Sequence, residues 1–236
     1  MDERSLKKLL DSPPEVVKKA VKRLAVSASR LRRQSRTFTF RGREYDYFAH
    51  AYNLAWRNER AVEIPIALEY LRAHPCQSVL EVGNVLSHYV KADHDIVDKY
   101  EVTRGVINED VVDYSPPKKY DLIISVSTLE HVGYDETPPD NQKAARAVAH
   151  LVDLLSPGGE MVATVPLGLS SNFDRLLESG EIAFTESYAM KRKKGNTWVQ
   201  SDIGSVRGAT YARYSFRASA LIVGVIRRGQ AEMEHG

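Results

Sequence analysis

Short and nearly continuous apolar segments recur along the chain after residue 76. Segments of this kind, unlike strictly alternating ones, are typical of parallel strands buried on both faces of a sheet. Seven of them predict the strands of one sheet, at SVLEV (78–82), HDIVD (94–98), GVIN (105–108), YDLIISVS (120–127), EMVATVPLG (160–168), IAFTESYAM (182–190) and SALIVGVIRR (219–228).

Helices are predicted between and before these strands. NQKAARAVAHLVDLL (141–155) has a helical spacing of apolar residues and is followed by Ser-Pro-Gly-Gly (156–159), which stops a helix. Residues 61–73 predict a second helix with an interruption at Pro65. Strands that alternate with helices indicate an α/β fold, here a doubly wound, mostly parallel, seven-stranded Rossmann-like sheet. Such sheets bind ligands at the carboxyl ends of their strands.

The first part of the chain has a different character. Thr37–Phe40 reads as a short strand, and Ser12-Pro13-Pro14-Glu15 predicts the start of an amphipathic basic helix that runs to Arg33. Residues 1–43 hold 13 Lys and Arg against four acidic residues, a net charge of +9, whereas the remainder carries −7. We expect residues 1–74 to form a basic helical extension that caps a Rossmann-like domain at 75–236. Its charge fits either an anionic partner or its own acidic domain.

Composition restricts the class of protein. The chain has 236 residues, a net charge of +2 and a single cysteine, Cys76, so an intramolecular disulfide framework and a cysteine-based zinc cluster are excluded. No apolar stretch approaches the ~18–20 residues of a membrane span, and the charged start MDERSLKKLL lacks the features of a secretory signal. We therefore expect a soluble, cytoplasmic protein.

Polar residues gather where the predicted strands end. Glu81 and Gly83 close the first strand, Asp98 the second, Glu109-Asp110 the third and Ser127 the fourth. A carboxylate in such a place can accept hydrogen bonds from ribose hydroxyls or from an adenine amino group. Neither a phosphate-binding G-x-x-x-x-G-K loop nor the dinucleotide fingerprint G-x-G-x-x-G is present. The pattern favours a nucleoside that carries a cation over NAD or ATP.

These segments resemble those of the class I, Rossmann-like, S-adenosylmethionine-dependent methyltransferases. The resemblance covers about residues 76–168, in the order expected for that fold. It rests on VLEVGN (79–84), IVDKYE (96–101), INEDVVDY (107–114), YDLIISVSTLEHVG (120–133) and LLSPGGEMVATVP (154–166).

The resemblance implies S-adenosylmethionine as cofactor and assigns residues to it. The loop with Glu81, Gly83 and Asn84 would lie against the methionine part, and Asp98 would hold the ribose. The adenine would be framed by Asp110 and Val111, and Ser127 would lie under the cofactor near its methyl group. The sequence departs from the family pattern after Gly83, because Asn84-Val85-Leu86-Ser87 replaces further glycines and only 15 positions separate Gly83 from Asp98, which requires a short first helix.

The implied activity is methyl transfer to a hydroxyl group, on a saccharide or glycan by resemblance to enzymes that act on sugars. A small natural product would fit equally well. A hydroxyl acceptor needs a base, for which His131 is the first candidate and His50, His88, His94 and Glu130 are the others. No metal is expected, because the spacing of histidines and acids fits no specific site. A homodimer is one option for the assembly.

Two other functions remain open. The glycine-poor loop favours a non-catalytic Rossmann-like module that binds a nucleoside or a partner protein. An NAD-dependent oxidoreductase lacks the required glycines. Nucleic-acid methylation is disfavoured because Ser-Thr-Leu-Glu (127–130) stands where such enzymes have Asp/Asn-Pro-Pro-aromatic.

Two further groups of residues suit an acceptor. The basic loop 191–195 is either solvated or meets an anionic acceptor. Stacking on a sugar face and hydrogen bonding to its hydroxyls would suit Tyr45, Tyr47, Tyr52, Trp56, Arg57 and Trp198.

Overall fold

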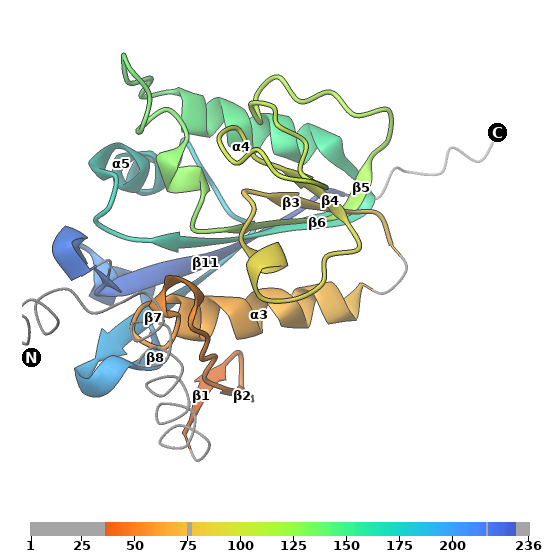
Figure 1. The fold of residues 1–236 in the computed structure, drawn as a ribbon. Coiled ribbons are helices and arrows are strands. Elements are labelled where there is room, and N and C mark those ends of the chain that lie inside the picture. Colours follow the sequence, from red (N-terminus) through yellow and green to blue (C-terminus); the bar gives the residue numbers. More distant parts are fainter. Residues whose placement is uncertain (1–35, 75–76, 216, 230–236) are drawn as a thin grey trace, which may run out of the picture.

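The computed structural model describes residues 36–74, 77–215 and 217–229 and contains a seven-stranded sheet (Figure 1). The predicted basic helix from Ser12 to Arg33 lies outside the described residues. The strand order is β4-β3-β5-β6-β11-β7-β8. Their bounds are β3 Val79–Val82, β4 Asp95–Val97, β5 Tyr120–Val126, β6 Leu155–Pro166, β7 Glu186–Lys193, β8 Thr197–Ser201 and β11 Ala220–Arg227.

The directions of the strands confirm the predicted fold class. β4, β3, β5 and β6 are parallel neighbours, whereas β11 is antiparallel to both β6 and β7, and β8 is antiparallel to β7. Five of the seven strands therefore point the same way. This is a doubly wound α/β sheet of the Rossmann-like kind, and its antiparallel strands lie in the half that follows β6.

Helices cover both faces of the sheet (Figure 1). α4 (Lys143–Leu154) and α5 (Ser171–Ser179) lie on one face, and α3 (Arg60–Ala73) lies on the other. Successive residues of β5 point to opposite faces: Leu122 packs in the core that includes α3, and Ile123 packs in the core that includes α4 and α5. This double burial explains why the strand is continuously apolar in the sequence.

Residues before α3 belong to the same core. β1 (Thr37–Phe40) and β2 (Arg43–Asp46) form a hairpin, which confirms the strand predicted at 37–40. Phe38 and Phe40 are buried against the α3 face of the sheet. A second small hairpin joins β9 (Tyr211–Ala212) to β10 (Arg217–Ala218). Single 3₁₀ turns are η1 Tyr52–Leu54, η2 Leu86–His88, η3 Leu129–His131, η4 Lys194–Asn196, η5 Ile203–Val206 and η6 Arg213–Ser215.

Pro65 does not interrupt α3, which is continuous from Arg60 to Ala73. A proline has no N–H for the carbonyl four residues earlier, which is that of Ala61. The backbone N–H of Phe48 donates to the Ala61 carbonyl instead, at 2.9 Å. The same bond ties the segment after β2 to the helix.

Several predicted boundaries are wrong. Residues 105–108 form only one bridge, between Ile107 and Val97, because Gly105 turns the chain with a φ of 87° just before it. The strand predicted from 182 begins at Glu186, and β6 begins at Leu155, directly after α4, so that the Ser-Pro-Gly-Gly segment lies inside a strand. Sequence reasoning also missed β8 and α5.

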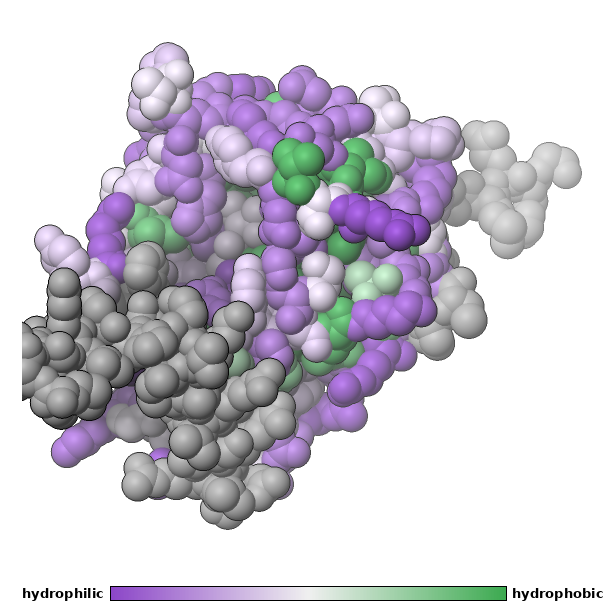
Figure 2. Space-filling view, viewed as in Figure 1, coloured by the Kyte–Doolittle hydropathy of each residue, from purple (hydrophilic) through white to green (hydrophobic). Residues whose placement is uncertain are grey.

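The described surface is mainly hydrophilic in the view of Figure 2, with apolar side chains in small groups. Among the described residues, no helix is both long and apolar enough to span a bilayer.

Candidate functional site

A pocket of about 480 Å³ opens where β3, β4 and β5 end. The carboxyl ends of parallel strands meet at one edge of a sheet, and this edge is where the sequence predicts the ligand site. Four apolar residues, Val82, Val97, Val111 and Val132, contribute to the wall. The polar lining consists of Asp98, Lys99, Tyr100, Glu109, Asp110, Thr128, His131 and Glu136.

Gly83 lines the pocket, and the loop after β3 requires a glycine at this position. Its φ is +83°, and a Cβ there would stand 2.2 Å from Thr128 Oγ1. Any other residue is therefore disfavoured at this position on both conformational and steric grounds. The Gly83 N–H donates to the Val97 carbonyl at 2.8 Å, which fixes the loop against β4.

Asn84, in place of a second glycine, introduces no positive φ. Its side chain is 5% exposed and its Nδ2 donates to Glu101 Oε1 at 2.8 Å. Glu101 also lies 3.1 Å from His88 Nε2. The short first helix expected between the first two strands is reduced to the single turn η2, held by these contacts.

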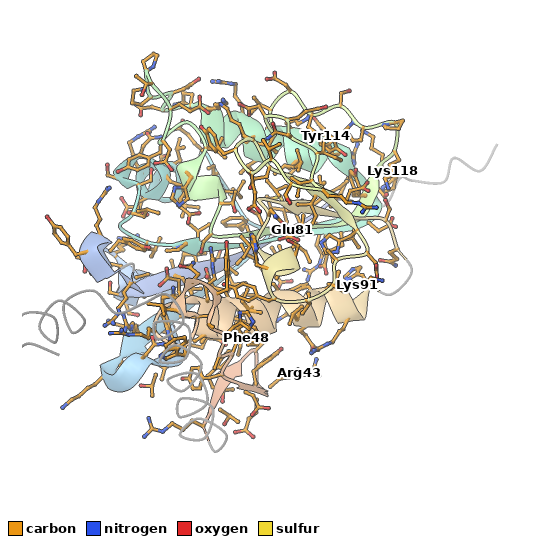
Figure 3. All side chains as sticks on the ribbon, viewed as in Figure 1. Arg43, Phe48, Glu81, Lys91, Tyr114 and Lys118 are labelled. Atoms are coloured by element: carbon orange, nitrogen blue, oxygen red, sulfur yellow. The ribbon has the colours of Figure 1, made fainter. Side chains whose placement is uncertain are left out.

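Glu81 is completely buried and does not line the pocket. Figure 3 shows it between the sheet and η2. Its Oε1 accepts from the N–H groups of Val85 and Leu86 at 2.8 and 2.6 Å, and its Oε2 lies 2.9 Å from His94 Nε2. The carboxylate therefore orders the loop that carries Gly83, and His94 is occupied as its partner.

Asp98 stands in the pocket directly after β4. Its Oδ2 accepts from Asn84 N–H at 3.0 Å, and its Oδ1 accepts from Tyr100 and Glu101 N–H, each at 2.8 Å. A carboxylate offers about four acceptor positions, so one on Oδ2 remains for a ligand.

Two acids and two lysines form a network beside the pocket. Lys143 Nζ donates to Asp110 at 2.5 Å and to Glu136 at 2.6 Å, and Lys99 lies 2.8 Å from both acids. Burial alone would raise the pKa of Asp110, but the hydrogen bonds from Lys143 and Lys99 lower it overall. The same two lysines lower the pKa of Glu136. Both acids are therefore carboxylates at neutral pH.

Ser127 has a φ of 43° at the end of β5 and lies against α3. Its Oγ donates to Glu63 Oε1 at 2.6 Å, and Thr164 Oγ1 donates to the same oxygen at 2.8 Å. Glu63 Oε2 accepts from Arg60 at 2.8 Å. The fully buried Glu63 thus joins α3 to β5 and β6, and sequence reasoning missed it, because no local pattern distinguishes it in an apolar helix.

Two more buried acids lie around this contact. Burial raises the pKa of Glu130 well above its ordinary value, and neither of its carboxyl oxygens has a hydrogen-bond partner among the described residues. Burial and the charge of Glu63 raise the pKa of Glu59 to about 7, although Glu59 accepts the N–H of Ala218 at 3.1 Å. Both groups therefore retain protons to a higher pH than an exposed glutamate.

His131 lines the pocket, and its Nδ1 lies 2.6 Å from Asp135 Oδ2. A proton on Nδ1 would be held by that carboxylate, which leaves Nε2 available as a base. The other histidines proposed as bases have different contacts: His88 stacks on Tyr52 with ring centroids 4.2 Å apart, and His50 Nδ1 accepts from the Tyr52 N–H.

Part of the proposed sugar-stacking surface is wrong. Trp198 is 2% and Tyr47 is 9% exposed, and both belong to the core on the α3 face. The Trp198 N–H donates to Tyr47 Oη at 2.7 Å, so the two residues fasten β8 to the segment after β2. Among the described residues, no three His, Cys, Asp or Glu side chains are grouped to hold a metal ion.

No protein-family model and no curated protein matches the sequence. Solved structures are similar in fold. N-methyltransferase NodS from Bradyrhizobium japonicum WM9, in complex with S-adenosyl-L-homocysteine, is 13% identical, with 72% of this chain and 88% of that chain covered and a TM-score of 0.44. The sugar N-methyltransferase KedS8 from Streptoalloteichus sp ATCC 53650 is 16% identical, with coverage of 78% and 96% and a TM-score of 0.39. These values describe a likeness of backbone, so function is argued from the pocket.

Proposed function

We propose that the pocket binds S-adenosylmethionine and that the protein transfers its methyl group to a hydroxyl group of a saccharide, a glycan or a small natural product. The observation that carries this proposal is the combination, at one sheet edge, of the Gly83 turn, the Asp98 carboxylate and an apolar wall. Aliphatic walls suit a planar base, and a carboxylate with a remaining acceptor position suits a ribose hydroxyl.

The charge of the pocket supports a cationic ligand. Asp98, Glu109, Asp110 and Glu136 contribute carboxylates, against Lys99 in the lining and Lys143 behind it. The excess of negative charge attracts a sulfonium ion and repels a diphosphate. This balance favours S-adenosylmethionine over NAD or ATP.

The described residues suggest how the parts of the cofactor would be held. Asp98 would accept one ribose hydroxyl, since its other positions are filled by backbone N–H groups. Val111 and Asp110 would border the adenine, and the backbone at Gly83 and Asn84 would face the methionine part. Glu81 and Ser127 would act indirectly, by holding the two loops in place. When bound, the cofactor supplies an electrophilic methyl group.

His131 is the base that we propose for a hydroxyl acceptor. It lines the pocket and is oriented by Asp135, so its Nε2 can take the acceptor proton. Such proton transfer contributes about 10²–10⁴-fold to a rate. The cytoplasmic location, the homodimer and the capping role of residues 1–74 stay predictions.

Transfer of label from methyl-labelled S-adenosylmethionine to a panel of sugars, sugar phosphates and glycans tests the proposal. We expect label in at least one hydroxyl acceptor and a loss of 10²-fold or more in His131→Ala. His74→Ala, at the opposite edge of the sheet after α3, is the matched control and should keep full activity. Binding of the cofactor without transfer to any acceptor would favour the non-catalytic module instead.

A further inference from the structure

A second pocket of about 630 Å³ lies beside β7, β8 and the β9–β10 hairpin. In the strand order, β7 and β8 are the strands farthest from β4. It is shallow and strongly basic, and we call it the basic pocket. Its lining includes Arg192, Lys193, Lys194, Asn196, Arg217 and Ser219. Residues 192–195 of the basic loop line this pocket together with Arg217, which comes from a distant segment of the sequence.

The positive charges of the basic pocket are not neutralised within the part of the chain that the structure describes. No described carboxylate forms an ion pair with its two arginines or its two lysines. The Nε of Arg217 is buried and has no hydrogen-bond partner among the residues that the structure describes. Burial lowers the pKa of Arg192, and the positive charge of Arg217, which lines the same pocket, lowers it further. Two like charges held near one another at a partly buried position are costly without an anion between them.

The negative charge of Glu59 acts on Arg192 in the opposite direction, raising its pKa, but Glu59 does not cancel the charge of the pocket. It is 5% exposed and already accepts the Ala218 N–H. Because its pKa is about 7, part of the population is protonated and neutral near physiological pH. The basic pocket therefore keeps a net positive charge.

The basic pocket opens at the same sheet edge as the pocket at Gly83. Adjacent residues of β11, Ala220 and Leu221, pair with Lys191 near the end of β7 and with Pro166 at the end of β6. β7 therefore runs in the same direction as β6 and β5, and it continues three residues past Met190, which is level with Pro166 at the end of β6. Three strand spacings separate β5 from β7, and at about 4.8 Å each they set a separation of at least about 14 Å between the two pockets across the sheet. The contacts of Glu59, Arg60 and Glu63 lie between them.

We propose that the basic pocket binds an anionic group of the methyl acceptor, so that the acceptor is an extended molecule carrying a phosphate ester, a sulfate ester or a carboxylate. The guanidinium groups of Arg192 and Arg217 match such groups as paired donors, and the two lysines add charge at the rim. This inference rests on the proposed function and adds the chemical class of its acceptor. A single neutral sugar would be too short to reach both pockets.

Calorimetric titration with inorganic pyrophosphate tests the site directly in the full chain. We expect binding to the unaltered protein and at least tenfold weaker binding to Arg217→Gln, with partial retention in Arg217→Lys. Arg72→Gln is the matched control: Arg72 is exposed near the end of α3, which lies at the opposite edge of the sheet, and its loss should leave the affinity unchanged. Arg192→Gln provides an independent variant should Arg217→Gln fail to fold.

Thermal unfolding separates a ligand site from a structural role. Without anion, Arg217→Gln should melt at the same temperature as the unaltered protein or higher, because a like-charge contact is removed. A lower melting temperature together with unchanged pyrophosphate affinity would overturn the inference. Competition against pyrophosphate by glucose 6-phosphate or glucuronate, but not by glucose, would support it and show whether a phosphate ester or a carboxylate is preferred.

A parallel titration with S-adenosylhomocysteine keeps the two proposals apart. Binding of S-adenosylhomocysteine without any binding of pyrophosphate would refute the basic pocket and leave the methyltransferase proposal intact. Binding of pyrophosphate without S-adenosylhomocysteine would establish an anion site but overturn its assignment to a methyl acceptor.

Discussion

Glu63 accepts a hydrogen bond from Ser127 across the interface between α3 and the end of β5, with 2.6 Å between Glu63 Oε1 and Ser127 Oγ. Ser127 has a positive φ, which L-residues other than glycine rarely adopt, so a partner outside its own loop holds it there. The contact makes the geometry of the site depend on a helix that lies far from it in the sequence.

We predict that Glu63→Ala destabilises the protein by about 3–5 kcal/mol, the range for removing one partner of a buried ion pair. Arg60 would lose its carboxylate, and the hydroxyls of Ser127 and Thr164 would lose their shared acceptor. Urea unfolding measures the change. Glu69→Gln on the same helix removes only a surface pair with Arg43 and should cost about 1 kcal/mol or less; equal effects of the two variants would contradict the role of Glu63.

Gly83 and Gly105 form a natural pair for a second prediction. Both have a φ near +85°, but a Cβ at Gly105 meets nothing within 4 Å, whereas one at Gly83 strikes Thr128. Gly105→Ala should therefore cost about 1–2 kcal/mol from backbone strain alone. Gly83→Ala should cost about 1–3 kcal/mol more from the clash. The difference between the two unfolding free energies is the measurement, and no difference would mean that Thr128 moves aside freely.

A third prediction concerns pH. Glu59 has a pKa of about 7 in the folded protein, above that of an unfolded glutamate near 4.5, so the folded state binds more protons between these values. The stabilisation from this group is complete below about pH 4.5 and is lost as the pH rises through 7. Glu130 is shifted in the same direction by its burial. The melting temperature should fall from pH 5 to pH 8, and Glu59→Gln should flatten that slope.

Glu69→Gln serves as the control for the pH series and should keep the slope of the unaltered protein. An equal slope in Glu59→Gln and in the unaltered protein over this interval would contradict the prediction, because Glu59 would then bind no additional proton on folding.

The sequence predicted those parts of the fold that depend on local pattern. Apolar runs located β3, β4, β5 and β11, because burial on both faces leaves a continuous signal. The segment 105–108 also contains apolar residues, but it forms a single bridge, between Ile107 and Val97, because Gly105 turns the chain just before it. The α5 helix did leave a signal that was missed: Ser170 caps its start and Gly180 ends it.

The site residues that could be predicted from the sequence pattern are those that follow the end of a predicted strand. Gly83, Asp98 and Asp110 line the pocket, as expected from their places after predicted strands, and Val111 lines it as the resemblance implies. Contacts between distant segments produce no local sequence pattern by which they could be predicted. Glu63 meets Ser127 from 64 positions away, and Arg217 in β10 comes to the basic loop because the chain after it pairs with β7, where the Arg192 N–H donates to the Ser219 carbonyl.

Calorimetric titration of the purified protein with S-adenosylhomocysteine tests the central claim most directly. We predict one site of micromolar affinity, weakened about 10–100-fold in Asp98→Ala, which corresponds to about 1–3 kcal/mol for a lost buried contact. Asp93→Ala, which removes an exposed acid whose ion pair is with the exposed Lys91, should bind like the unaltered protein. Absence of heat with the unaltered protein, or equal affinity in Asp98→Ala, would contradict the assignment of this pocket to the methyl donor.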